Sequence, residues 1–292
     1  MEHVNAPIEF TSKNIRHKLC EDRRRTSRAP RVSVVIPAKN EARNLELILP
    51  ELPQVHEVIL VDGRSVDDTA ATAQRVMPSI QVVGQSRCGK GNALACGFTA
   101  ATGDIIVMFD ADGSADPREI PRFVEALVGG ADFAKGSRRL EGGGSEDITH
   151  LRSAGNRAFS GLTNALFGTG FTDLCYGYNA FWRDILEDLN LPPVDLQTVN
   201  PAKMAMNGMA WGDGFEIETL LNCRVAAAAL TVAEVPSVEK ERIHGVSNLN
   251  AFNDGLRVLR TIFVERQRKA LADRRAKVPW VRLKPSPSKV AG

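Results

Sequence analysis

Short apolar segments alternate with helix-like segments along residues 32–110, and this alternation most limits how the chain can fold. Apolar, mostly β-branched runs predict buried strands at residues 32–37, 57–63, 80–83 and 104–110. Apolar residues at helical spacing or capping residues predict helices at residues 40–52, 67–76 and 89–101. The connections are short, as in units that alternate strand and helix. The pattern therefore predicts an α/β fold with a Rossmann-like, doubly wound, mostly parallel sheet.

The second half of the chain has a looser pattern. Helices are predicted at residues 120–128, 151–168, 214–226 and 250–276, with a strand at residues 230–238. Residues 168–178 are rich in turn formers, and the residues from Pro279 onward form a Pro/Lys-rich tail that we expect to be disordered.

Composition narrows the class of protein. The 292 residues are 43% hydrophobic, but no stretch approaches the roughly 20 apolar residues that cross a bilayer. No apolar run follows the first residues, so no secretory signal is expected. The five cysteines include no C-x-x-C pair, which favours reduced thiols in a cytoplasmic protein.

Charge is unevenly distributed. Residues 1–31 carry eight Lys/Arg against four Asp/Glu, and residues 260–292 carry ten against two. The middle of the chain is correspondingly acidic, since the totals are 37 and 35. Two interpretations stay open: basic ends that meet an anionic membrane surface, or solvated tails.

Polar residues follow three of the predicted strands, at the edge where ligands bind in sheets of this kind. Asp110 and Asp112 follow the fourth strand, on one tight turn. Two adjacent carboxylates repel each other, and Mg²⁺ or Mn²⁺ resolves that conflict while sharing its coordination shell with phosphates. Asp62, at the end of the second strand, is suited to accept hydrogen bonds from a ribose or a base, or else to end a capping turn.

A basic, glycine-containing segment opens the predicted helix at residues 89–101. The backbone amides of Gly89-Lys90-Gly91 and the Lys90 side chain are suited to hold a phosphate. The Walker sequence G-x-x-x-x-G-K-[ST] is absent, which argues against an ATPase or a kinase.

Five motifs in order along the first half of the chain resemble family 2 of the inverting glycosyltransferases, and with later landmarks the resemblance covers roughly residues 32 to 255. They are Val34-Val35-Ile36-Pro37-Ala38-Lys39-Asn40-Glu41, Val61-Asp62-Gly63-Arg64-Ser65, Gly89-Lys90-Gly91-Asn92-Ala93, Ala101-Thr102-Gly103-Asp104 and Asp110-Ala111-Asp112-Gly113. The branch they resemble most transfers mannose or glucose to dolichyl or polyprenyl phosphates. Later landmarks are Lys135-Gly136-Ser137-Arg138, Asp173-Leu174-Cys175-Tyr176-Gly177-Tyr178-Asn179, Glu234-Val235-Pro236 and Arg242-Ile243-His244-Gly245-Val246-Ser247. The resemblance implies a GT-A fold with an acceptor-binding subdomain.

The resemblance also implies roles for individual residues. Those expected to bind the nucleotide-sugar are Pro37, Ala38, Asn40, Glu41, Asp62, Gly63, Lys90, Asp110, Ala111, Arg242 and Ser247. Asp110, Asp112 and Ser114 would hold Mg²⁺ or Mn²⁺, with Ser114 standing where the branch often has glutamine. Arg138 and Arg152 match positions that hold an acceptor phosphate, and Arg242 with Ser247 matches a basic loop that closes over the donor.

The acceptor decides whether a general base is required. A hydroxyl acceptor must lose a proton as it attacks, and Glu216 and Asp213 are the candidate bases. A phosphate acceptor is already ionised and needs none. Glu216 and Glu218 also have a structural interpretation, since acidic residues stabilise the first turn of a helix.

The sequence thus predicts a metal-dependent inverting glycosyltransferase that uses a GDP- or UDP-sugar. The catalytic candidates are Asp112, Arg138, Arg152, Glu216 and Asp213. The chain is divided into a basic N-terminal arm (1–31), a nucleotide-sugar-binding part (32–135), an acceptor-binding part (136–250), and a basic amphipathic helix with a tail (251–292). The acceptor is a polyprenyl phosphate or, alternatively, a soluble hydroxyl compound; a third alternative is a non-catalytic scaffold that binds nucleotide-sugars. No nucleic-acid partner is expected, while peripheral contact with the inner face of the membrane and homo-oligomerisation stay open.

Overall fold

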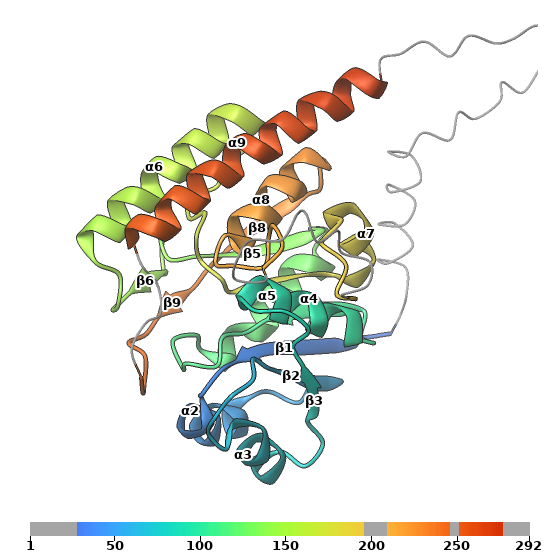
Figure 1. Cartoon of the computed structure of the whole chain (residues 1–292), viewed down its shortest axis with the longest axis vertical. Helices are drawn as coiled ribbons and strands as arrows, with labels where there is room; N and C mark the ends of the chain where they lie inside the picture. Colours follow the sequence, from blue (N-terminus) through green and yellow to red (C-terminus); the bar gives the residue numbers. More distant parts are fainter. Residues whose placement is uncertain (1–27, 196–208, 246–250, 277–292) are drawn as a thin grey trace, which may run out of the picture.

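A seven-stranded mixed sheet forms the centre of the computed structural model, which describes residues 28–195, 209–245 and 251–276 (Figure 1). The strand order is β3-β2-β1-β4-β7-β5-β8. The strands are β1 (Val32–Ala38), β2 (Glu57–Asp62), β3 (Gln81–Gly84), β4 (Ile105–Met108), β5 (Phe133–Ser137), β7 (Asn179–Trp182) and β8 (Val232–Pro236). β1 pairs in parallel with β2 and β4, and β2 pairs in parallel with β3. The predicted mostly parallel α/β sheet is therefore confirmed.

Two strands of this seven-stranded sheet, β5 and β7, were not predicted. β7 runs antiparallel to both β4 and β5, and β5 pairs in parallel with β8. The sequence of β5, Phe-Ala-Lys-Gly-Ser, carries a lysine and a glycine that are unusual inside a strand. β7 has the sequence Asn-Ala-Phe-Trp, without the β-branched residues that marked the predicted strands.

Helices cover both faces of the sheet and form a further layer outside it. They are α2 (Ala42–Ile48), α3 (Thr69–Val76), α4 (Lys90–Ala100), α5 (Ile120–Val128), α6 (His150–Phe167), α7 (Leu186–Leu189), α8 (Ile217–Ala227) and α9 (Ala251–Ala276). A second, two-stranded sheet joins β6 (Gly144–Ser145) to β9 (Val238–Glu239). The predicted helices agree with these bounds to within a few residues, except that the 40–52 helix ends in a 3-10 turn at Leu49–Glu51.

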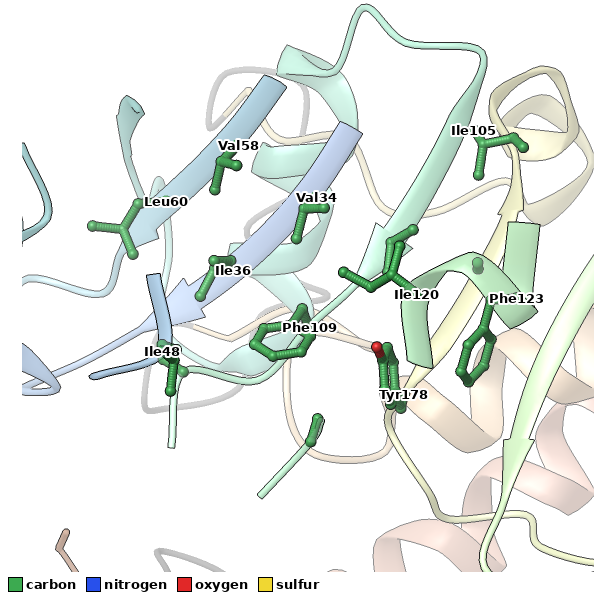
Figure 2. Packing of buried hydrophobic residues seen from close by; sticks show 14 of the residues in the cluster. Val34, Ile36, Ile48, Val58, Leu60, Ile105, Phe109, Ile120, Phe123 and Tyr178 are labelled. Atoms are coloured by element: carbon green, nitrogen blue, oxygen red, sulfur yellow. The ribbon is translucent and has the colours of Figure 1, made fainter. Parts of the chain in front are cut away.

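Alternate side chains of the central strands enter two separate cores. Val34, Ile36 and Leu60 pack on the face that α2 and α5 cover, together with Phe109 and Tyr178 (Figure 2). Their neighbours along the strands, including Val35, Ile59 and Ile106, pack on the opposite face with residues of α4 and α8. Both faces of the sheet are thus buried, which explains the continuous apolar runs in the sequence.

A third layer lies outside α8, where α6 and α9 run side by side at the end of the molecule away from α2 and α3 (Figure 1). Phe171, which follows α6, packs with Cys223 of α8 and Ile262 of α9 in a separate apolar cluster. Arg224 of α8 forms a buried ion pair with Glu265 of α9, with 3.1 Å between nitrogen and oxygen. None of the helices in the described part of the chain has the length and apolar character of a membrane span.

Candidate functional site

One cavity of about 610 Å³ opens at the carboxyl ends of β1, β2 and β4 and extends to the space beside α6 and α9. Most of the residues expected to bind the donor or metal line it: Pro37, Ala38, Glu41, Gly63, Lys90, Asp110, Ala111, Asp112, Ser114 and Arg242. Arg138 and Arg152, the two basic residues expected at the acceptor, line the same cavity. The topology thus brings together residues up to about 200 positions apart in the sequence.

Asp110 lies at the end of β4 and forms an ion pair with Lys90 of α4. The Nζ atom of Lys90 is 2.7 Å from Asp110 Oδ1 and 2.8 Å from Oε1 of Glu218, in the first turn of α8. Burial raises the pKa of Asp110, as do the nearby charges of Asp112 and Glu218, while Lys90 opposes the rise. Burial alone would lower the pKa of Lys90, but Asp110 and Glu218 hold it above its usual value. Lys90 is therefore a permanent cation between two carboxylates.

Asp112 has a different cation. Its Oδ2 atom lies 2.8 Å from Nη2 of Arg242, and Arg242 is also 3.6 Å from Glu41. Its Oδ1 atom accepts hydrogen bonds from the amide (3.0 Å) and hydroxyl (2.7 Å) of Ser114. Burial raises the pKa of Glu41, which the charge of Arg242 opposes.

The segment that carries Arg242 is anchored to the aspartate turn through its backbone. The amide of Lys240 donates to the Ser114 carbonyl at 2.8 Å, and the amide of Ile243 donates to the Asp112 carbonyl at 3.2 Å. Ile243 also packs over Gly113, where a Cβ would lie 2.5 Å from the Ile243 side chain. The predicted closing loop therefore lies across the Asp-x-Asp turn as far as Gly245, while Ser247 falls outside the described residues.

The donor set fits a divalent cation that arrives with a phosphate. In the described part of the chain, no three His, Cys, Asp or Glu side chains gather as a self-sufficient metal site. Asp110 and Asp112 supply two carboxylates on one turn, with the Ser114 hydroxyl beside them. Mg²⁺ and similar ions are usually held by one or two carboxylates and complete their shell with water and substrate phosphates.

The glycine-containing helix entrance has a role that differs from the prediction. The amides of Gly91 and Asn92 donate to the carbonyl of Asp213, at 2.8 and 3.3 Å, and are not available to a phosphate. A Cβ on Gly91 would lie 1.9 Å from the Gly212 carbonyl oxygen, so glycine is needed for this close approach. The Gly91 amide is therefore not free to hold a phosphate, whereas Gly89 and Lys90 line the cavity. A phosphate contact through Gly89 and Lys90 stays a prediction.

Neither candidate base lines the cavity. Asp213 is only 1% exposed and forms a two-point ion pair with Arg87, at 2.6 and 2.9 Å. Glu216 Oε1 accepts hydrogen bonds from the amides of Gly212 (3.1 Å) and Gly214 (3.4 Å) and shapes the turn before α8. Of the acidic residues at the start of α8, Glu218 does line the cavity, although only a helix-stabilising role was predicted for it.

A signal for Glu218 is present in the sequence. Residues 217–225, Ile-Glu-Thr-Leu-Leu-Asn-Cys-Arg-Val, show no polar face at helical spacing, and all nine are buried. A carboxylate in such a helix needs a buried partner. Lys90 is that partner.

Two expected donor-binding residues face the neighbouring loop instead of the cavity. Asn40, at φ +59°, accepts a hydrogen bond from the Val66 amide at 2.8 Å. Asp62 accepts from the Ser65 amide at 3.3 Å. Both stabilise the turns that follow β1 and β2, and the adjacent residues Glu41 and Gly63 line the cavity.

Arg138 is held in the wall of the cavity by two carboxylates. It donates to both oxygens of Asp173 at 2.7 and 2.9 Å and to Glu239 at 2.9 Å, and its side chain is 7% exposed. Its guanidinium also lies over the Tyr176 ring, 4.8 Å from the centroid. Burial alone would raise the pKa of Asp173, but Arg138 lowers it to about 2. Arg152 is held less tightly: the Asp147 carboxylate is 3.5 Å away, and the Arg152 side chain is 26% exposed.

Apolar side chains of α6 and α9 continue the cavity beyond Arg152. Ile148, Leu151 and Phe159 come from the α6 side, and Phe252 and Val258 from α9. Leu151 is 74% exposed, so this end of the cavity presents an apolar surface to the outside. The cavity is therefore polar and charged at one end and apolar at the other.

Comparison with known proteins agrees with this geometry. Residues 33–189 match the family described as Glycosyl transferase family 2. The chain is 32% identical over 235 residues to the polyprenol monophosphomannose synthase of Mycolicibacterium smegmatis, covering 76% of this chain and 82% of that protein. It is 31% identical over 230 residues to the undecaprenyl-phosphate mannosyltransferase of Micrococcus luteus, covering 75% and 88%. Among solved structures, glucosyl-3-phosphoglycerate synthase of Mycobacterium tuberculosis in complex with phosphoglyceric acid aligns with a TM-score of 0.61 and 23% identity, over 82% of this chain and 80% of that one.

Proposed function

This chain belongs to glycosyl transferase family 2, and we propose that it transfers a sugar from a GDP- or UDP-sugar to a polyprenyl phosphate, with inversion at the anomeric carbon. The observation that carries the proposal is the single cavity that joins the Asp110–Asp112 turn to the apolar groove between α6 and α9. A polyprenyl phosphate has the matching chemistry, an anion at one end of a long apolar chain. The names of the two bacterial relatives also favour this acceptor class.

In the proposed reaction a phosphate oxygen of the acceptor attacks C1 from the face opposite the leaving group. The C1–O bond to the acceptor forms as the C1–O bond to the nucleoside diphosphate breaks, and the electron pair leaves with the diphosphate. The acceptor phosphate is already ionised, so no proton has to be removed. Lys90 and Arg242 line the donor end, where cations stabilise the developing negative charge.

We further propose that Asp110 and Asp112, with Ser114, hold Mg²⁺ or Mn²⁺ there. When bound, the ion acts as a Lewis acid on the leaving diphosphate. A solved structure of the mycobacterial glucosyl-3-phosphoglycerate synthase contains Mn²⁺ with UDP-glucose, at 23% identity and a TM-score of 0.60. That likeness concerns the fold, and the two carboxylates on one turn are the support from this chain itself.

The acceptor phosphate is assigned to Arg152, with Arg138 as its neighbour. Both line the cavity between the donor end and the apolar groove. Because Asp173 and Glu239 already bind the Arg138 guanidinium, Arg152 has more freedom to meet an incoming phosphate. Arg138 then contributes mainly by fixing this wall of the cavity.

A soluble hydroxyl acceptor is the second candidate. It requires a carboxylate base in the cavity, and Asp213 and Glu216 do not line it. Glu218 does, but its Oε1 atom lies 2.8 Å from the Lys90 ammonium and is already part of an ion pair. The geometry therefore favours the phosphate acceptor.

Contact with a membrane follows from this acceptor. Leu256 and Phe263 of α9 are 53% and 47% exposed, at helical spacing, and Arg260 lies on the same exposed side. We expect α9 to lie on anionic lipid. Changing both apolar residues to serine should weaken co-sedimentation with phosphatidylglycerol vesicles, while unchanged binding would refute this contact. Cytoplasmic location and homo-oligomerisation stay predictions.

The first experiment is a thermal-shift panel of GDP, UDP, dTDP, CDP and ADP, each with and without Mn²⁺. Stabilisation by one nucleotide that depends on Mn²⁺ would identify the donor class, because ligands that bind the native state raise its stability. Transfer is then assayed with the matching nucleotide-sugar and polyprenyl phosphate in detergent. Turnover with a soluble hydroxyl acceptor but not with the lipid would overturn the acceptor assignment, and no nucleotide binding at all would overturn the enzyme itself.

A further inference from the structure

Each carboxylate of the Asp-x-Asp turn already has a cation of the chain itself. Lys90 lies 2.7 Å from Asp110, and Arg242 lies 2.8 Å from Asp112. These contacts occupy oxygens that a divalent cation would need. A metal that binds here therefore competes with two ion pairs and does not simply enter between unpartnered carboxylates.

Each of these cations also has a second carboxylate. Lys90 is 2.8 Å from Glu218, and Arg242 is 3.6 Å from Glu41. If Asp110 and Asp112 turn to a metal, neither cation is left buried without a partner. Four carboxylates and two cations give this cluster a formal charge of −2, which a divalent cation cancels.

The packing around Lys90 keeps these partners together. A Cβ on Gly177 would lie 3.0 Å from Lys90 Nζ, 3.1 Å from Glu218 Oε1 and 3.2 Å from Asp110 Oδ2. Glycine at this position leaves room for the three charged groups to meet. The Glu218 side chain is only 7% exposed, so it has little alternative to this contact.

We propose that Lys90 and Arg242 are exchangeable counter-ions of the metal site, and that Glu218 and Glu41 are positioning residues that keep them beside the donor diphosphate. The metal then binds weakly alone and more tightly with the nucleotide, because the diphosphate attracts both cations away from Asp110 and Asp112. By thermodynamic linkage the metal strengthens nucleotide binding by the same factor. This inference rests on the proposed function, since it assumes a divalent cation at Asp110 and Asp112.

The test is to titrate the donor-free protein with MnCl₂ alone and to measure the dissociation constant of Mn²⁺. Either calorimetry or the electron paramagnetic resonance signal of free Mn²⁺ serves as the readout. Arg242→Gln should bind Mn²⁺ about tenfold more tightly than wild type, equivalent to about 1.4 kcal/mol. The reason is that Asp112 loses its competing cation. An arginine that only contacts the donor would leave the affinity for Mn²⁺ alone unchanged.

Lys240→Gln is the matched control. Lys240 lies two residues from Arg242 and is paired with Asp116 at 3.0 Å, away from the cavity, so its loss changes the net charge equally without freeing Asp112. Arg242→Lys keeps the competing charge and should bind Mn²⁺ as wild type does. The proposal is overturned if Arg242→Gln binds Mn²⁺ no more tightly than Lys240→Gln.

A second measurement reads Glu218. With Mn²⁺ present, Glu218→Gln should weaken UDP or GDP binding about tenfold. Glu218→Asp should recover part of that affinity, because it keeps the carboxylate that positions Lys90. Wild-type nucleotide affinity in Glu218→Gln would contradict this part. The Mn²⁺ titration needs no nucleotide, so it tests the counter-ion exchange even if neither UDP nor GDP binds. Absence of nucleotide binding would count against the proposed function and not against the counter-ion exchange.

Discussion

Replacing Asp213 by asparagine separates a structural role from a catalytic one. The Asp213 carboxylate binds Arg87 through two charge-assisted hydrogen bonds of 2.6 and 2.9 Å, with side-chain exposures of 2% and 0%. Asparagine keeps the size of the side chain but leaves the Arg87 guanidinium charged and buried. Breaking a buried pair in this way costs about 3–5 kcal/mol. Two charge-assisted hydrogen bonds at about 1.5–3 kcal/mol each give a similar figure.

We therefore expect Asp213→Asn to lower the free energy of unfolding by about 3–5 kcal/mol in urea denaturation, with turnover per folded molecule close to wild type. Arg87→Met is the partner variant, and the double variant should cost less than the sum of the two single changes, because the two residues are coupled. A variant that keeps wild-type stability but loses turnover would show that Asp213 is the base after all, and the structural argument would be refuted.

Three further predictions concern the cavity. Asp112→Asn should lower turnover by about two orders of magnitude or more, the scale of losing one charge-stabilising group, with the melting temperature retained; wild-type turnover would refute the metal assignment. Arg152→Gln should raise the KM for polyprenyl phosphate about tenfold, because a charge-assisted contact to the phosphate is lost. Arg157→Gln changes an exposed residue of the same helix and should leave the KM unchanged; equal effects of the two variants would exclude a specific phosphate contact. Because Arg138 holds the pKa of Asp173 at about 2, below its unfolded value near 4, the pair stabilises the fold above pH 4 and loses this contribution as pH falls toward 2. The difference in unfolding free energy between wild type and Arg138→Met should therefore shrink by about 2 kcal/mol over that range, and a constant difference would contradict the assignment.

The donor end of the cavity could be predicted because it depends on local sequence. Buried parallel strands appear as apolar runs, and the residues that follow them must meet at one edge of the sheet. Pro37, Gly63, Asp110 and Asp112 all follow such runs, and all line the cavity. The two carboxylates on one turn indicated a metal, and the resemblance to a family contributed the nucleotide-sugar, which spacing alone does not give.

The rest depends on contacts that no local pattern encodes. Glu218 becomes part of the site only because α8 packs beside the start of α4, 128 residues earlier in the chain, where Lys90 lies. Asp213 was a reasonable base on residue type, but its partner Arg87 is 126 residues away. β5 was missed because Lys135, which is fully buried, donates to the Tyr176 carbonyl at 2.8 Å inside the protein, whereas a lysine usually indicates a surface.

Different structural elements form the two ends of the cavity, so the two ends can change independently. The donor end rests on strand ends fixed by the sheet. The acceptor end rests on α6 and α9, which pack on α8 through a small apolar cluster and the buried Arg224–Glu265 ion pair. Substitutions on α6 and α9 can therefore alter the acceptor groove without disturbing Asp110 and Asp112. A family that keeps one donor chemistry while varying its acceptors would gain from this separation, and acceptor selectivity in this chain should be sought in Leu151, Phe159 and Val258.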